Sequence, residues 1–131
     1  MSREDLSSYM AERSDYLQDL TKVLREEVHT NDANTIKEHL CVIITHRPTI
    51  STMLAKLEKY LDEALHENLT SKEKGETELD RKITMDARVS EYRYWRNVVE
   101  GLLKSIDVQA SAMQSLLSFE KKYLTHLEHA Q

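Results

Sequence analysis

The chain has 131 residues, with 18 Lys and Arg against 23 Asp and Glu, a formal net charge of −5. This length fits one domain with a modest core and excludes a multidomain enzyme. With 2 Gly, 1 Pro and 1 Phe, the chain is poor in residues that build turns, sheets and phosphate-binding loops, so long helices are favoured. The single cysteine excludes an internal disulfide, and the sequence shows neither a signal peptide nor a membrane segment. We therefore expect a cytoplasmic protein.

Two helices are predicted before residue 68. Apolar residues spaced three and four apart predict a first helix over about the first 28 residues. We expect it to end at residues 29–32, where Thr, Asn and Asp side chains can cap the next helix. The second helix is predicted over about residues 33–67. Pro48 lacks an N–H, so we expect a kink or break there, which would divide this helix into two segments.

Residues 68–80 lack apolar periodicity and contain Gly75, so we expect an exposed connection. The hydroxyls of Thr70, Ser71 and Thr77 are available there to cap helices.

Residues 81–131 carry the strongest pattern, six heptads without a skip. One heptad position reads Met85, Tyr92, Val99, Ile106, Met113, Glu120 and Leu127, and the other reads Val89, Arg96, Leu103, Ala110, Leu117 and Leu124. A flanking row from Trp95 to Tyr123 widens the apolar stripe, so we expect contacts with more than one neighbouring helix.

The predicted fold is all-α, a helical bundle whose long heptad helix forms an oligomeric, coiled-coil-like assembly. It is a single helical domain, 1–131, made of N-terminal helices (1–67), a loop (68–80) and a long oligomerisation helix (81–131). A helix of roughly 65 Å is too long to be covered by the preceding helices in a compact monomer, so we expect a homo-oligomer. The predicted oligomerisation residues are Val99, Leu103, Ile106, Met113, Leu117, Leu124 and Leu127.

A basic and aromatic segment opens the long helix. Residues 81–96 hold five basic against two acidic side chains, interleaved with Tyr92, Tyr94 and Trp95. Cations that follow phosphates and rings that stack on bases suit a nonspecific surface for single-stranded DNA. Alternatively, Tyr92 and Trp95 belong to the core, because both lie on the apolar stripe, and the arginines are solvated or paired charges. The candidate nucleic-acid-binding residues are Lys72, Lys74, Arg81, Lys82, Arg88, Arg93 and Tyr94.

Other candidate sites favour structural interpretations. Arg47 and Arg96 interrupt apolar seams, which favours a role in register or oligomeric state over ligand contact. The histidine pairs are His39/His46 and His126/His129. They lack the companions and spacing of zinc motifs, so we expect surface histidines and no metal site. No acid–base pair, nucleophile elbow or Gly-rich loop is evident, so we expect neither catalysis nor a cofactor.

The order of several segments resembles a known family. HRPTISTMLAKLE has a polar start and a leucine-rich run, and a polar loop follows it. Next come ITMDARVSEYRYWRNVVEGLLKSIDVQASAMQSL, with the pair Tyr94-Trp95, and the ending Leu116-Leu117-Ser118-Phe119. Over about residues 33–128 this layout resembles the UvsY-like recombination mediators of T-even phages. The resemblance implies a homo-oligomer that binds single-stranded DNA in recombination and repair, and helps a recombinase displace the single-strand-binding protein.

One departure from that family concerns its DNA contacts. The basic pair that ends the family's central helix falls at His66 and Asn68 here, neither of them a strong cation. We therefore expect DNA contacts at Lys72 and Lys74 or in the 81–96 segment. The alternative function is a helical scaffold or adaptor protein of a phage without a nucleic-acid partner. The heptads and the acidic residues 1–67, with 8 basic and 13 acidic side chains, would suffice for that.

Overall fold

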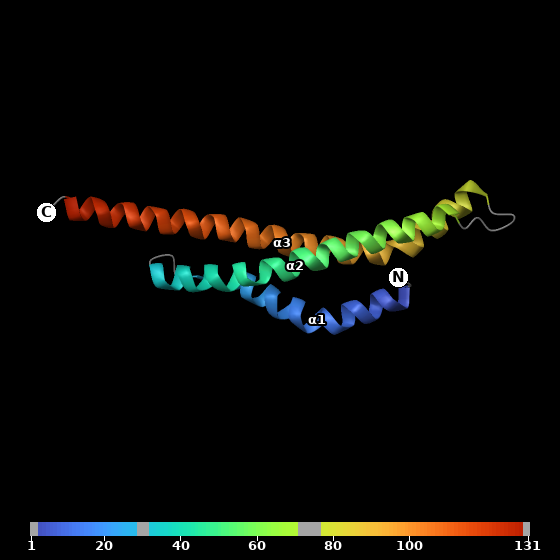
Figure 1. Ribbon diagram of the computed structural model, residues 1–131, viewed down its shortest axis with the longest axis horizontal. Coiled ribbons are helices and arrows are strands. Elements are labelled where there is room, and N and C mark those ends of the chain that lie inside the picture. Colours follow the sequence, from blue (N-terminus) through green and yellow to red (C-terminus); the bar gives the residue numbers. More distant parts are fainter. Residues whose placement is uncertain (1–2, 29–31, 71–76, 130–131) are drawn as a thin grey trace.

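The computed structural model describes residues 3–28, 32–70 and 77–129. These residues form three helices, α1 (Arg3–Arg25), α2 (Ala33–Thr70) and α3 (Glu78–His129), and contain no strand. In Figure 1, α2 and α3 run antiparallel as a long hairpin, and α1 lies along it. The α1 helix contacts both α2 and α3. The predicted all-α fold is confirmed.

Side chains cap the second and third helices. Asp32 Oδ1 accepts a hydrogen bond from the backbone N–H of Asn34 at 3.0 Å, and Asp32 Oδ2 accepts one from the Thr35 hydroxyl at 2.9 Å. Thr77 Oγ1 accepts a hydrogen bond from the backbone N–H of Asp80 at 3.1 Å. These bonds satisfy donors that have no partner inside the helix. The caps predicted from Asp32 and Thr77 are therefore confirmed, whereas residues 29–31 and Ser71 lie outside the described residues.

Of the two outcomes predicted at Pro48, a kink or a break, the break is wrong, because α2 continues through Pro48 as one helix of 38 residues. Proline removes the hydrogen bond to the Ile44 carbonyl, a local cost of roughly 3 kcal/mol. Ile43 and Ile50 flank Pro48 on the inner face and are fully buried. Burying two such side chains contributes about 1.5–3 kcal/mol each, which is enough to outweigh that cost.

One core runs along the three helices. Its fully or nearly buried α3 residues, Val89, Tyr92, Val99 and Ile106, belong to the predicted heptad face. Its α2 members are Ile43, Ile50, Met53, Leu57, Leu61 and Ala64, and its α1 members are Leu6, Met10, Leu17, Leu20 and Leu24. Trp95 and Leu102 of the flanking row pack against this core and are partly buried. Because α3 contacts both other helices, the prediction that it has more than one neighbour is confirmed.

The last part of α3 lies beyond this core. Met113 is the last buried residue of α3. We call residues 117–129 the tail, which extends past the start of α2 in Figure 1. The large apolar side chains exposed there by 45–68% are Phe119, Tyr123, Leu124 and Leu127. The uncovered part of the heptad seam is therefore short, because α2 is about 57 Å long and covers most of α3.

Candidate nucleic-acid and assembly surfaces

The predicted nucleic-acid-binding residues are only partly described. Lys72 and Lys74 lie outside the described residues, and so does the side chain of Arg88, although its backbone belongs to α3. Arg81 is half-buried, and Lys82 is exposed. Arg93 and Tyr94 are exposed as well. The structure therefore places four of the seven candidates, all on α3.

Lys82 and Arg93 lie on the same side of α3, because they are eleven residues, about three helical turns, apart. Arg93 Nη1 lies 3.7 Å from Asp86 Oδ1, and the two side chains are 44% and 53% exposed. An exposed pair of this kind contributes about 0–1 kcal/mol or less to stability. A phosphate can therefore replace Asp86 as the partner of Arg93 at little cost.

Tyr94 is the accessible ring of the segment, with 60% of its surface exposed. Its ring centroid lies 5.1 Å from that of Trp95, edge to face at 72°. Tyr92 is buried and Trp95 is partly buried, so the interpretation of these two as core residues is confirmed. Burial raises the pKa of Tyr92, and the carboxylates of Glu67 and Glu91 raise it further. Of the three rings, only Tyr94 is open enough to stack on a base.

Arg47 joins α2 to α3 at the edge of their interface. Its Nε and Nη2 donate to Asp107 Oδ1 and Oδ2 at 2.7 and 3.3 Å. The hydrogen bond with Arg47 holds the pKa of Asp107 below its ordinary value. The pair therefore stabilises the fold above the ordinary pKa of aspartate and loses this effect as pH falls through the lowered one. Its two-point geometry fixes the position of the helices relative to each other.

Arg96 is the second arginine in an apolar seam. It is half-buried, and its Nη2 donates to Asn97 Oδ1 at 3.2 Å. Its Nε is buried without a hydrogen-bond partner among the described residues.

The prediction of surface histidines is wrong for His39, which is 8% exposed. Its Nε2 lies 3.1 Å from Gln109 Oε1, and Gln109 Nε2 donates to the backbone carbonyl of Leu24 at 2.6 Å. Because Gln109 Oε1 accepts, His39 Nε2 is the donor. We call these three groups the Gln109 network, which joins all three helices. The signal for it was present, since His39 lies between Ile36 and Ile43 on the inner face of α2.

A second histidine also bridges helices. His46 is half-buried, and its Nδ1 lies 2.8 Å from Tyr16 Oη of α1. The described residues contain no group of three or more His, Cys, Asp or Glu that could hold a metal ion.

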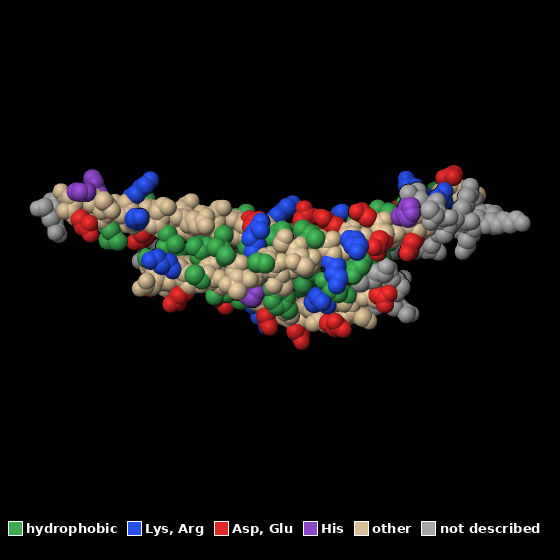
Figure 2. All heavy atoms as spheres, viewed as in Figure 1, with side chains coloured by type: hydrophobic (Ala, Val, Ile, Leu, Met, Phe, Trp, Pro, Cys, Tyr) green, Lys and Arg blue, Asp and Glu red, His purple; other side chains and the backbone are tan. Residues whose placement is uncertain are grey.

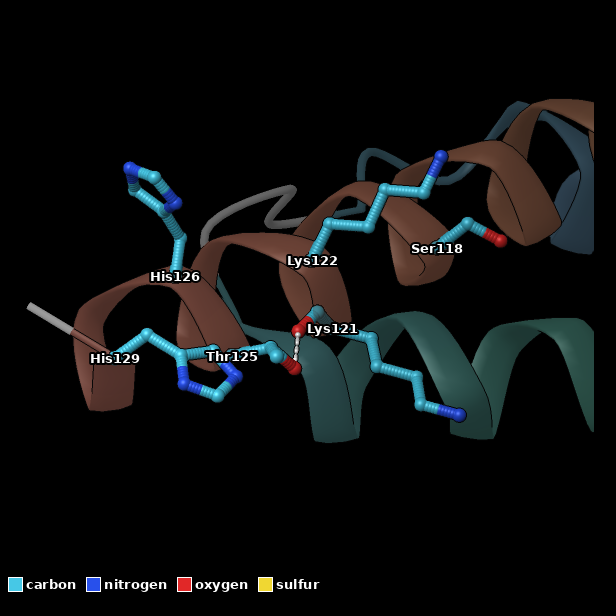
Figure 3. A pocket seen from close by; sticks show the side chains of 6 residues that line it. All are labelled: Ser118, Lys121, Lys122, Thr125, His126 and His129. Carbon is cyan, nitrogen blue, oxygen red and sulfur yellow. Dashed lines mark hydrogen bonds between the residues drawn. The ribbon is translucent and has the colours of Figure 1, made fainter.

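The tail carries two lysines that sequence reasoning did not single out. An open hollow of about 420 Å³ is lined by Ser118, Lys121, Lys122, Thr125, His126 and His129. Figure 3 shows that the Lys121 and Lys122 side chains point to opposite sides of the helix. They therefore do not converge on one ligand and present a cationic surface instead.

No family model, curated protein or solved structure matches the chain. In the part of the chain that the structure describes, no helix combines the length and apolarity needed to cross a bilayer.

Proposed function

We propose that the protein is a non-enzymatic recombination mediator that binds single-stranded DNA as a homo-oligomer and helps load a recombinase onto DNA coated by single-strand-binding protein. The observation that carries the proposal is the exposure of Arg93 and Tyr94, next to each other in the segment that resembles the mediator family.

The chemistry of DNA binding follows from these side chains. Lys82 and Arg93 supply cations on one side of α3, and Tyr94 supplies a stacking ring on the adjacent face. A chain with a net charge of −5 binds DNA weakly on its own. Several linked copies engage one strand together, and this raises the effective affinity without new contacts.

The tail supports the oligomer in this proposal. Leu124 and Leu127 continue the heptad seam beyond α2 and are 56% and 45% exposed. Leu117, the first residue of the tail, is half-buried. The predicted oligomerisation residues Val99 and Ile106 are already buried within the chain. We therefore assign the contact between copies to the tail part of the seam.

Replacing Lys82 and Arg93 with Ala is expected to weaken binding of single-stranded DNA. Each lost phosphate contact should reduce the slope of log affinity against log salt by about 0.7. The control is Lys22→Ala/Lys37→Ala, which removes the same number of positive charges from exposed residues of α1 and α2 and should leave that slope unchanged. Fluorescence anisotropy with a labelled oligonucleotide at several salt concentrations measures the affinity and the slope for each variant. Absence of binding by the wild-type protein at low salt would contradict the proposal.

The mass of the assembly tests whether copies of the chain contact one another through the tail. Light scattering of the wild-type protein should give several times the chain mass of 15.3 kDa. Leu124→Glu/Leu127→Glu should give smaller assemblies, because the charges fall on the apolar face. Thr125→Glu/His126→Glu adds the same number of carboxylates on other faces of the tail and should keep the mass. A wild-type monomer at micromolar concentration, or equal effects of the two variants, argues against assembly through the tail.

A second candidate function is a helical scaffold or adaptor without a nucleic-acid partner. It is favoured by the pairing of basic side chains with nearby carboxylates, as in Arg47 with Asp107 and Arg93 with Asp86. This function requires the assembly to form normally while the anisotropy measurement shows no binding of DNA at low salt.

A further inference from the structure

A hollow of about 400 Å³ lies between α1 and α2. Tyr9 and Arg13 of α1 line it on one side, and Lys56 lines it from α2. The lining contains two basic side chains and no acidic one, although the chain has 23 acidic and 18 basic residues. In Figure 2, basic side chains lie close together where α1 meets α2. We call this hollow the α1–α2 pocket.

Two contacts between α1 and α2 flank the pocket. At one end, Tyr16 Oη lies 2.8 Å from His46 Nδ1. At the other end, the rings of Tyr9 and Tyr60 meet edge to face, with their centroids 6.3 Å apart. From the first contact to the second, residue numbers fall along α1 and rise along α2, so the two helices are antiparallel here. The pocket is therefore formed by two helices that already pack against each other on both sides of it.

Both cations of the pocket lie against the ring of Tyr9. The guanidinium carbon of Arg13 is 3.6 Å from the ring centroid, and Lys56 Nζ is 4.8 Å from it. The separation of the two cations cannot exceed the sum of these distances, about 8 Å, and like charges that close repel each other. Attraction to the ring offsets part of this repulsion. The α1–α2 pocket thus holds two positive charges in a small volume.

Carboxylates of the chain do not neutralise this pair. Arg13 Nη1 lies 3.5 Å from Glu12 Oε2, but the Glu12 side chain is 75% exposed, and an exposed pair of this kind is weak. The same Nη1 donates to the backbone carbonyl of Tyr9 at 2.9 Å. Lys56 makes no ion pair within the part of the chain that the structure describes. Both cations are therefore available to an anion that enters the pocket.

We infer that the α1–α2 pocket binds a phosphorylated small molecule, with its phosphate monoester group between Arg13 and Lys56. Such a group carries about 1.5 to 2 negative charges at neutral pH, so it balances both cations, whereas a carboxylate balances only one. The guanidinium offers paired N–H donors to phosphate oxygens, and the ammonium acts as a point charge. Charge-assisted hydrogen bonds are about 2.8 Å long, so one phosphate can reach both cations.

The remaining side chains of the pocket suit an organic group joined to the phosphate. Thr52 is exposed one turn before Lys56 on α2, so its hydroxyl can donate to the same phosphate. Pro48 and Met53 add apolar surface to the lining. A volume of about 400 Å³ falls in the range of pockets that hold small molecules. The expected ligand therefore combines one phosphate monoester with a small apolar group.

Isothermal titration calorimetry of the full chain with phenyl phosphate tests the charge requirement. Phenyl sulfate is the matched control ligand, because it has nearly the same shape but only one negative charge. At about pH 7.5 and constant ionic strength, phenyl phosphate should bind at least about tenfold more tightly than phenyl sulfate. Equal affinities for the two esters would overturn the inference, and so would the lack of saturable binding of phenyl phosphate up to about 10 mM.

Inorganic phosphate tests whether the organic group contributes. It lacks the ring that would contact Pro48 and Met53, so it should bind more weakly than phenyl phosphate. Equal or tighter binding of inorganic phosphate would overturn the assignment of the pocket to an organic ester.

Substitutions test the location of the site. Lys56→Gln and Arg13→Gln should each weaken binding of phenyl phosphate at least about tenfold and bring its affinity close to that of phenyl sulfate, because one cation then remains. Lys22→Gln/Lys59→Gln removes an exposed cation outside the pocket from each of the same helices and should change the affinity much less. Circular dichroism checks folding, and Lys56 is exposed, so Lys56→Gln tests the site even where Arg13→Gln disturbs α1. Unchanged selectivity for phosphate over sulfate in folded Lys56→Gln would overturn the inference.

The Lys82→Ala/Arg93→Ala variant separates this inference from the proposed function. Both of its changes lie on α3, whereas the α1–α2 pocket is lined by residues of α1 and α2. This variant should therefore bind phenyl phosphate as tightly as the wild-type protein does, whether or not the protein binds DNA. A loss of phenyl phosphate binding in this variant, with the helices intact, would place the phosphate on α3 and overturn the inference.

Discussion

Replacing Ile106 with Ala is expected to lower the free energy of unfolding by about 2–5 kcal/mol. Ile106 is fully buried in the core that α3 shares with α1 and α2. The substitution removes apolar contacts and leaves a cavity that three packed helices can close only in part. Urea denaturation followed by circular dichroism, at one fixed protein concentration, measures the change.

The matched control is Ile83→Ala on the same helix. Ile83 is 58% exposed, so its truncation should change the free energy of unfolding by only about 0.5 kcal/mol or less. Equal losses at the two positions would mean that the packing of α3 against α1 and α2 is not the main source of stability.

Gln109→Leu is expected to cost about 1–3 kcal/mol of stability. Leucine has a similar size but can neither donate to the Leu24 carbonyl nor accept from His39. Both groups would then lack the hydrogen bonds that they make in the Gln109 network. Thermal and urea unfolding of the variant measure the loss.

A double variant separates this effect from a change in packing. In His39→Leu/Gln109→Leu the buried imidazole is gone, so the double variant should lose less than the sum of the two single variants. Strict additivity would show that His39 and Gln109 do not act through their hydrogen bond.

Helix positions were predictable from the sequence because local chemistry determines them. Asp32 and Thr77 cap helices in the structure with the side-chain oxygens that the sequence offered. The course of α2 through Pro48 was not predictable from local chemistry. Ile43 and Ile50 pack in one core with residues of α3, and this packing stabilises the helix through Pro48. A local rule about proline takes no account of such contacts between distant segments.

The heptads predicted which face of α3 is buried but not which chain covers it. Val99 and Ile106 are buried, as their spacing indicated, yet α1 and α2 of the same chain surround them. Heptad spacing of apolar residues indicates that a helix packs against another helix. It does not indicate whether that helix belongs to the same chain or to a second molecule. Among the predicted oligomerisation residues, only Leu124 and Leu127 are exposed.

The candidate site was predictable in part. Tyr94 was singled out because it lies off the apolar stripe, and the structure exposes it. Lys121 and Lys122 were missed, because two lysines in a long charged helix have no local pattern that distinguishes a surface from a site. The spacing of His39 from Ile36 and Ile43 indicated its burial, but its partner, Gln109, is 70 residues away in the sequence and could not be predicted.

The position of the tail beyond the core has a consequence for hydrogen exchange. Backbone amides open locally at a free energy set by the contacts around them, and residues 121–129 are exposed throughout. In a free chain their amides should exchange far faster than those near Ile106. Assembly through the tail would then slow exchange there first, so the occupancy of the contact can be followed residue by residue. Each copy that joined through the tail would lose the freedom of these turns to open, and this entropic cost would weaken the contact.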